Sequence, residues 1–96
     1  LVEGISLSLN LPEDYFYKNY TKDPSLSFRL FNYPVNKDSR KDSNEWGFAE
    51  HTDIGLLTIL SQDNTGGLQV KSKQDGWIDA TPIPDSFVCN IGDMLD

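Results

Sequence analysis

The sequence predicts a mainly β fold preceded by helices, and it favours a jelly roll or barrel over an α/β sheet. Short apolar stretches with strand alternation recur from residue 46 onward, and turn residues such as Gly, Asp and Asn separate them. Few helical stretches lie between them. A length of 96 residues allows one small domain at most, and a hydrophobic content of 38% fits a folded chain.

Residues 1–24 are expected to form a helical lead-in. A second helix within it is predicted to start at Pro12, since proline suits the first helical turn. Glu13 and Asp14 would then lie at the positive end of the helix dipole, and Asp23-Pro24 would close the element. The first helix is predicted from apolar residues that recur near the 3.6-residue period: Leu1, Val2, Ile5 and Leu9.

The next stretch predicts a strand followed by a surface connection. Leu26, Phe28 and Leu30 alternate with other residues in a pattern typical of a strand, which would end at Tyr33-Pro34. Residues 36–45 contain no apolar side chain. A mixed charged run of this kind is expected to be a solvated loop.

Further strands are predicted from residue 46 onward. Ala49, His51 and Asp53 would share one strand face, and Ile54–Leu60 is apolar enough for a strand covered on both sides. Asp75-Gly76 is a strong hairpin signal. The other predicted strands are residues 68–71, 77–80 and 87–91, and the predicted turns include residues 63–67 and Gly92-Asp93.

Charge and cysteine content limit the partners and the compartment. Fifteen acidic and eight basic residues give a formal net charge of −7, which disfavours nucleic acid and anionic membranes as partners. The single cysteine, Cys89, is expected to be a buried strand thiol in a reducing compartment, which indicates a cytoplasmic protein. No signal peptide or membrane span is recognisable, and a chain starting with Leu1 is expected to begin inside a larger protein.

His51-Thr52-Asp53 is the main candidate for chemistry. It places the one histidine of the chain two residues from a carboxylate, and residues i and i+2 of a strand project to the same side. An imidazole and a carboxylate that converge supply two of the three ligands of a 2-His-1-carboxylate facial triad, which holds Fe(II) with open positions. A strand histidine bonded to a nearby aspartate would give the same pattern, so both interpretations stay open.

Five blocks in register extend this interpretation. They are Phe28–Pro34, the residues around His51 and Asp53, Gly66–Val70, Gly76–Ile78 and Asn90–Leu95. Together they resemble the isopenicillin N synthase-like branch of the iron(II)- and 2-oxoglutarate-dependent dioxygenases, and the resemblance extends over the whole chain. It implies a partial, C-terminally truncated double-stranded β-helix, a form of jelly roll. Residues 1–24 would be its helical lead-in and residues 25–96 the first part of its core, within a single partial domain.

The resemblance implies an oxidoreductase that uses Fe(II), 2-oxoglutarate and O₂ to hydroxylate, desaturate or cyclise a small organic substrate. His51 and Asp53 would be metal ligands. Tyr33, and more weakly Asn32, would bind the co-substrate. The distal histidine of the family, and the arginine-serine pair that binds 2-oxoglutarate, lie downstream of the Asn90–Asp93 block and outside this chain. The isolated 96 residues are therefore expected to be inactive.

Other interpretations stay open beside this one. The parent protein could be an iron oxidase of the same fold that does not use 2-oxoglutarate, or a non-catalytic jelly-roll binding module. Tyr33 could be a core aromatic residue instead of a co-substrate ligand. Trp46 and Trp77 are expected to be packing residues, and Asp93 a turn residue.

Overall fold

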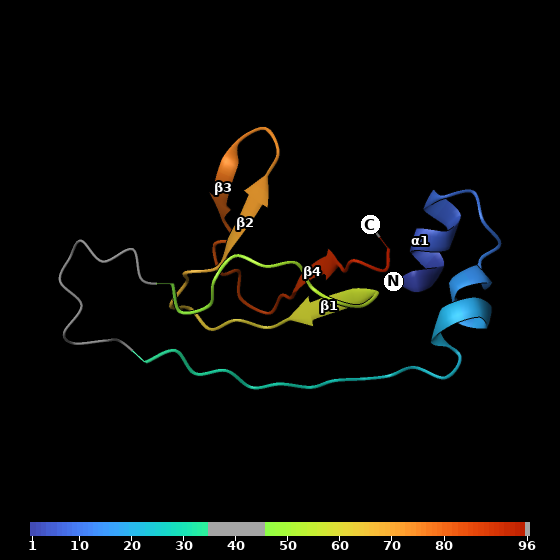
Figure 1. Ribbon diagram of the computed structural model, residues 1–96, viewed down its shortest axis with the longest axis horizontal. Coiled ribbons are helices and arrows are strands. Elements are labelled where there is room, and N and C mark those ends of the chain that lie inside the picture. The colour runs from blue at the N-terminus through green and yellow to red at the C-terminus, as the bar shows by residue number, and fades with distance from the viewer. Residues whose placement is uncertain (35–45, 96) are drawn as a thin grey trace. The chain divides into compact units, whose positions relative to one another are not determined.

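The computed structural model describes residues 1–34 and 46–95 (Figure 1). The chain divides into two compact units, residues 1–43 and 44–96, and each unit is described by itself. In the described residues, the first unit contains helices and the second contains short antiparallel strand pairs. The expectation of helices followed by strands is confirmed at this level. No helix in the described ranges has the length and apolar content needed to cross a membrane.

The first unit is built on two helical segments. Helix α1 spans Val2–Ser8. Ser6 is fully buried, and its Oγ is satisfied there because it donates to the Val2 carbonyl at 3.0 Å. The second segment follows Pro12, as predicted, and contains the π-helical turn η1, Tyr17–Thr21. Phe16 is only 6% exposed, and its ring centre lies 5.8 Å from that of Tyr20. The contact with Tyr20 thus helps to bury Phe16, which forms the small core of this unit.

The strand predicted between Leu26 and Tyr33 is not formed. Residues 24–34 have no regular secondary structure, and the side chains of Leu26, Phe28 and Leu30 are 86–87% exposed. Alternation makes a segment suitable for a sheet, but a strand also needs a neighbour. In the described residues both strand pairs are formed by other segments. The predicted connection at 36–45 lies outside the described residues.

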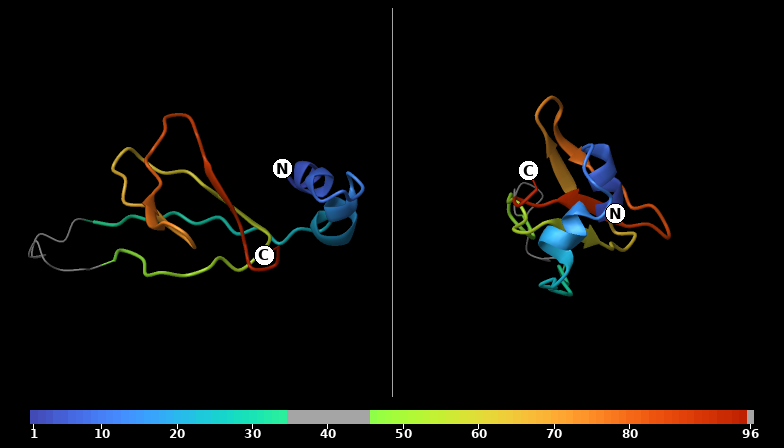
Figure 2. Two further views of the ribbon diagram at one scale, coloured as in Figure 1. Left: turned by 90° about the horizontal axis from the view of Figure 1, so that it is seen from above. Right: turned by 90° about the vertical axis from the view of Figure 1, so that its right-hand side faces the viewer.

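Two antiparallel pairs form the second unit (Figure 2). β1, Leu57–Leu60, pairs with β4, Val88–Ile91, in a register that sets Thr58 opposite Asn90. β2, Gln69–Ser72, and β3, Gly76–Asp79, form a hairpin. Gly76 has a φ of 73°, which a turn of this kind requires and which glycine adopts without strain. The hairpin predicted from Asp75-Gly76 is therefore confirmed.

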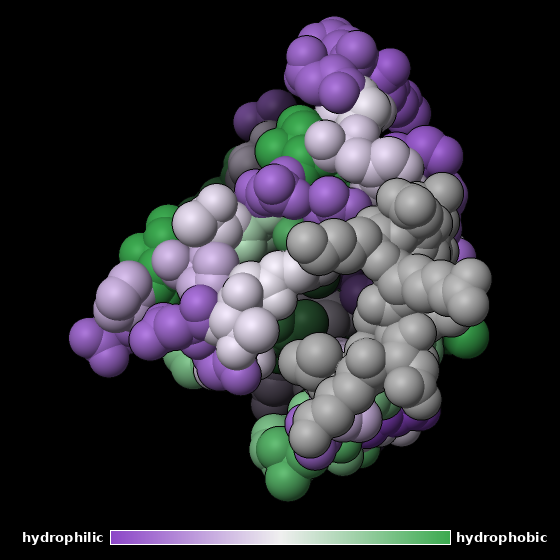
Figure 3. All heavy atoms as spheres, turned by 90° about the vertical axis from the view of Figure 1, so that its left-hand side faces the viewer, coloured by the Kyte–Doolittle hydropathy of each residue, from purple (hydrophilic) through white to green (hydrophobic). Residues whose placement is uncertain are grey.

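Four predictions about strand extent and burial in this unit are wrong. Residues 49–53 do not form a strand, and the strand predicted from Ile54 begins at Leu57. Ile54 and Ile59 are 90% and 57% exposed, and Cys89 is exposed instead of buried. Ile59 and Cys89 are exposed because β1 and β4 form a sheet of two strands, whose faces no second layer covers in the described residues of this unit. Figure 3 accordingly shows hydrophobic residues, in green, open at the surface beside hydrophilic ones.

A close backbone contact fastens the end of β4 to the segment before β1. The Gly92 N–H donates to the Leu56 carbonyl at 2.9 Å, and the Asp93 N–H donates to the Asp53 carbonyl at 2.8 Å. The Met94 N–H donates to the Gly55 carbonyl at 3.0 Å. A Cβ on Gly92 would lie 2.3 Å from the Gly55 carbonyl oxygen, so no larger residue fits without a backbone shift. Residues 90–94 are called the clasp below.

We expect Gly92→Ala to lower the free energy of unfolding by about 1–3 kcal/mol, because the added methyl overpacks the clasp against rigid backbone. Urea unfolding followed by tryptophan fluorescence measures this, since both tryptophans lie in the second unit. Gly4→Ala is the matched control, because a Cβ there meets nothing within 4 Å. Equal stability of Gly92→Ala and the unchanged chain would contradict the close contact.

Candidate metal centre

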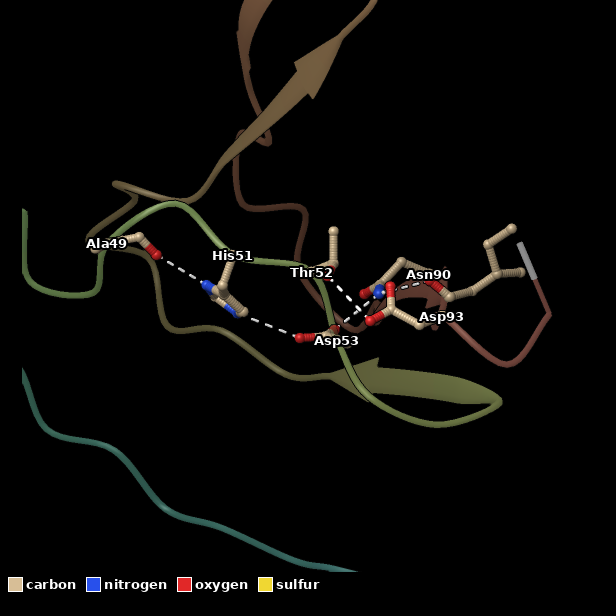
Figure 4. Close-up of polar contacts among 7 residues, drawn as sticks. Ala49, His51, Thr52, Asp53, Asn90 and Asp93 are labelled. Atoms are coloured by element: carbon tan, nitrogen blue, oxygen red, sulfur yellow. Dashed lines mark hydrogen bonds and ion pairs between the residues drawn. The ribbon is translucent and has the colours of Figure 1, made fainter.

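His51 and Asp53 converge although they do not lie in a strand (Figure 4). The distance from His51 Nε2 to Asp53 Oδ1 is 3.2 Å. The two side chains are 49% and 29% exposed, so the pair lies at a surface that small molecules reach. The predicted convergence of the two side chains is thus confirmed, although the segment has no regular secondary structure.

The backbone fixes the tautomer of His51. Its Nδ1 lies 2.8 Å from the Ala49 carbonyl oxygen, which only accepts hydrogen bonds, so Nδ1 carries the proton. Nε2 of the neutral ring is therefore the atom with a free lone pair, and this atom faces Asp53. The ring of Phe48 packs edge-on against the imidazole, with centroids 4.4 Å apart. A hydrogen bond to one ring nitrogen that orients the other is the usual support of a metal-binding histidine.

The two oxygens of Asp53 have different surroundings. Oδ1 faces the imidazole, whereas Oδ2 accepts a hydrogen bond of 2.8 Å from the Asn90 side-chain amide. This bond to Asn90 is the main reason that the pKa of Asp53 lies below its ordinary value of 3.8. The Thr58 side chain and the contact with His51 lower the pKa of Asp53 further, and partial burial opposes them. Asp53 is therefore an anionic oxygen donor at neutral pH.

This donor set fits a small divalent cation. With a neutral ring, Nε2 and Oδ1 turn lone pairs toward each other at 3.2 Å, an arrangement that a proton or a metal ion between them relieves. Metal–ligand bonds of about 2.1 Å at a right angle place two donor atoms about 3.0 Å apart, close to the spacing found. Within residues 1–34 and 46–95 no cluster of three or more His, Cys, Asp or Glu side chains is arranged to hold a metal. The chain thus presents a ligand pair.

The clasp supports the pair from the downstream side. Thr52 Oγ1 donates to Asp93 Oδ2 at 3.1 Å, across 41 residues of sequence. Asp93 lies in a turn closed by the Leu95 N–H and the Gly92 carbonyl, which confirms its predicted place. It also contacts the segment between the two candidate ligands, which the turn signal did not predict.

The β2–β3 hairpin supports the pair from the upstream side. Trp46 packs on Trp77 with ring centroids 5.0 Å apart, and both side chains are partly exposed, so their role as packing residues stays a prediction. Glu50 accepts a hydrogen bond of 2.7 Å from Lys71 Nζ, which also lies 5.4 Å from the centre of the Trp77 ring. Both sequence neighbours of His51 are therefore held by hydrogen bonds, Glu50 by Lys71 and Thr52 by Asp93.

The structure does not place Tyr33 or Asn32 relative to the pair, because they belong to the first unit. Tyr33 is 55% exposed, and its ring stacks on that of Phe31 with centroids 5.9 Å apart. It is thus no core residue of its unit. Their expected role in binding a co-substrate stays a prediction.

Sequence reasoning missed the contacts that orient the ligand pair. The sequence patterns predict no role for the Asn90 side chain, the Thr58 side chain or the Ala49 carbonyl, although all three contact the ligand pair. One signal was available for Asn90, since it is a polar residue of low strand propensity inside the otherwise apolar stretch Phe87–Ile91. Its partner could not be read from the sequence, because that requires the register of β1 against β4.

Comparison with protein families matches residues 18–96 to the 2OG-Fe(II) oxygenase superfamily. The matched range includes His51, Asp53 and the clasp, together with Tyr33 and Asn32. The resemblance noted from the five sequence blocks is thereby confirmed.

Comparison with curated proteins gives relatives of the same kind. The chain is 56% identical to a probable iron/ascorbate oxidoreductase and 48% identical to a 1-aminocyclopropane-1-carboxylate oxidase, both of Dictyostelium discoideum, over 100% of its length. It is 43% identical over 99% of its length to a homoarginine-6-hydroxylase of Oryza sativa subsp. japonica. It spans 30–33% of the length of these relatives.

The lowered pKa of Asp53 predicts a pH dependence of stability. A carboxylate whose pKa is lower in the folded chain stabilises the fold above its ordinary pKa, and this contribution is lost as the pH falls through the folded value. We therefore expect Asp53→Asn to reduce the free energy of unfolding at about pH 7 and to have a smaller effect at about pH 2. Urea unfolding of the metal-free chain at the two pH values measures this.

Ser86→Ala is the control, because Ser86 Oγ bonds the Ile83 carbonyl and no titrating side chain. Its effect should be the same at both pH values. An effect of Asp53→Asn that does not change with pH would show that the carboxylate is not stabilised in the folded chain.

Proposed function

The chain belongs to the 2OG-Fe(II) oxygenase superfamily, and we propose that the protein containing it is an Fe(II)- and 2-oxoglutarate-dependent dioxygenase. Its substrate would be a small organic molecule that is hydroxylated, desaturated or cyclised with O₂. The observation that carries this proposal is the 3.2 Å approach of His51 Nε2 to Asp53 Oδ1, with the tautomer and the charge that a metal pair needs.

His51 Nε2 and Asp53 Oδ1 would hold the iron. When bound, Fe(II) supplies the redox chemistry that activates dioxygen, and a template for the reacting groups. The Ala49 carbonyl accepts a hydrogen bond from Nδ1, so in the neutral imidazole the lone pair of Nε2 faces Asp53. Hydrogen bonds from the Asn90 and Thr58 side chains lower the pKa of Asp53 and so favour its ionised form. The third protein ligand would come from outside these 96 residues, since the chain has one histidine.

Tyr33 and Asn32 are proposed to bind the carboxylate of 2-oxoglutarate. What supports this is their place in the block Phe28–Pro34, which lies within the matched family range, and the exposure of the Tyr33 side chain. A phenolic hydroxyl is a suitable donor to a carboxylate, and such a charge-assisted bond contributes about 1.5–3 kcal/mol.

For the fold, we propose that residues 1–24 are a lead-in and residues 25–96 the first part of a double-stranded β-helix, together a single partial domain. Two antiparallel pairs of short strands are compatible with this, and the family match supports it. The exposed apolar side chains of Ile54, Ile59 and Phe87 would then be covered by the remainder of the barrel.

A second candidate is an iron oxidase of the same superfamily that does not use 2-oxoglutarate. The observation that favours it is the naming of the Dictyostelium relatives, one as an iron/ascorbate oxidoreductase and one as an oxidase. Both are more similar to this chain than the rice homoarginine-6-hydroxylase is.

Succinate formation separates these candidates. We expect the whole protein, with Fe(II) and O₂, to convert 2-oxoglutarate to succinate as it oxidises its substrate, with homoarginine and 1-aminocyclopropane-1-carboxylate as the first compounds tested. His51→Ala should abolish turnover, because it removes a metal ligand. Ser86→Ala is the control, since Ser86 is exposed and its Oγ bonds the Ile83 carbonyl, outside the ligand pair. Substrate oxidation without succinate would support the second candidate and contradict the first.

Tyr33→Phe tests the co-substrate site. We expect it to raise the KM for 2-oxoglutarate by about tenfold or more, because the variant lacks the hydroxyl that would bond the carboxylate. Steady-state kinetics with varied 2-oxoglutarate measures this. Tyr17→Phe is the matched control, since Tyr17 is a similarly exposed tyrosine in η1. If both variants kept the KM of the unchanged protein, Tyr33 would have no role in co-substrate binding.

A further inference from the structure

We propose that Asn90 is a positioning residue that keeps Asp53 a one-oxygen metal ligand. This inference rests on the proposed function, because it assigns a metal to the pair. It adds a residue that neither the sequence nor the resemblance singled out for this role. The observation behind it is the division of contacts on one carboxylate, with Oδ1 toward His51 and Oδ2 on the Asn90 amide.

The geometry of Asn90 suits this task. Its Nδ2 donates to Asp53 Oδ2 at 2.8 Å, and it also approaches its neighbour's carbonyl, that of Ile91, at 3.3 Å. Both contacts use the amide nitrogen, so the amide is oriented with its donor side toward the carboxylate. Asn90 lies in β4, where the pairing with β1 fixes its backbone opposite Thr58. The Asn90 amide therefore projects from a hydrogen-bonded strand and not from a loop.

The rest of the clasp holds the backbone of Asp53 in the same place. The Asp93 N–H donates to the Asp53 carbonyl, and the contact of Gly92 with Gly55 leaves no room for this segment to slide. With its backbone fixed, the carboxylate keeps mainly its own side-chain rotation. The Asn90 amide restrains that rotation, because turning the carboxylate would break a charge-assisted hydrogen bond.

The hydrogen bond from Asn90 limits the number of metal positions that Asp53 can occupy. A carboxylate that binds through both oxygens occupies two positions on a metal, whereas one oxygen occupies one. Occupation of Oδ2 by Asn90 leaves Oδ1 alone to bind beside His51 Nε2. More positions then stay open for other ligands, as oxygen chemistry at such a site needs. Outer-shell partners of this kind typically contribute a factor of about 10–100 in metal affinity.

The test measures Co(II) binding, as an air-stable stand-in for Fe(II), to the whole protein that contains this chain. Asn90→Leu removes the amide at similar volume, and Asn90→Val is a second variant suited to a strand position. We expect both to weaken Co(II) binding about 10–100-fold. In the infrared spectrum, we expect the antisymmetric and symmetric carboxylate stretches of metal-bound Asp53 to lie closer in frequency than in the unchanged protein. A smaller difference is typical of a carboxylate that binds a metal through both oxygens. Circular dichroism reports whether each variant is folded.

Gln69→Leu is the matched control. Gln69 donates its side-chain amide to Asp79 Oδ1 at 2.8 Å across β2–β3, so the control deletes the same kind of bond away from the ligand pair. It should leave Co(II) affinity and the infrared separation unchanged. Unchanged binding in folded Asn90→Leu or Asn90→Val, or equal weakening by Gln69→Leu, would overturn the role of Asn90.

His51→Ala and Asp53→Ala separate this inference from the proposed function. Loss of Co(II) binding in both, together with normal binding in the Asn90 variants, would leave the metal pair standing and refute the role of Asn90. Co(II) binding that neither His51→Ala nor Asp53→Ala weakens would refute the metal pair itself, and the inference with it.

Discussion

The close approach of Gly92 to the backbone of residues 53–55 is the constraint on which the candidate site depends. It brings two segments together that lie about forty residues apart in sequence, as the Thr52–Asp93 separation of 41 shows. Three backbone hydrogen bonds, from Gly92, Asp93 and Met94, hold the contact. Asp53 lies in a segment without regular secondary structure, so its backbone position depends on this contact.

The clasp also explains how a site forms in a unit with so few buried side chains. Among the described residues, Phe16 in the first unit is the buried hydrophobic side chain, and the second unit leaves many apolar groups exposed. Precision at the ligand pair therefore comes from hydrogen bonds and local packing. The Ala49 carbonyl sets the imidazole, Asn90 sets the carboxylate, and the hairpin secures Glu50 beside them. Each of these contacts uses backbone or strand positions, which are more rigid than loops.

The sequence could predict those features that depend on local order. Asp75-Gly76 predicted the hairpin correctly, because a turn depends on a few neighbouring residues. The convergence of His51 and Asp53 was also predicted, although the strand geometry from which it was argued is not formed. The strand at 26–33 and the burial of Cys89 were predicted wrongly, since each depends on a neighbouring strand or layer that local alternation does not supply. The role of Asn90 was not predictable for a related reason. It depends on the pairing of β4 with β1, which sets Asn90 opposite Thr58, and on a hydrogen bond from Asn90 to Asp53 across 37 residues of sequence.

The central claim is that His51 and Asp53 bind one metal ion through Nε2 and Oδ1. The most direct measurement is a crystal structure of the whole protein with Co(II), in which anomalous scattering locates the metal. The account predicts a peak about 2.1 Å from both atoms, with Asp53 Oδ2 still bonded to Asn90. A peak bound by neither residue, or by only one of them, would contradict it.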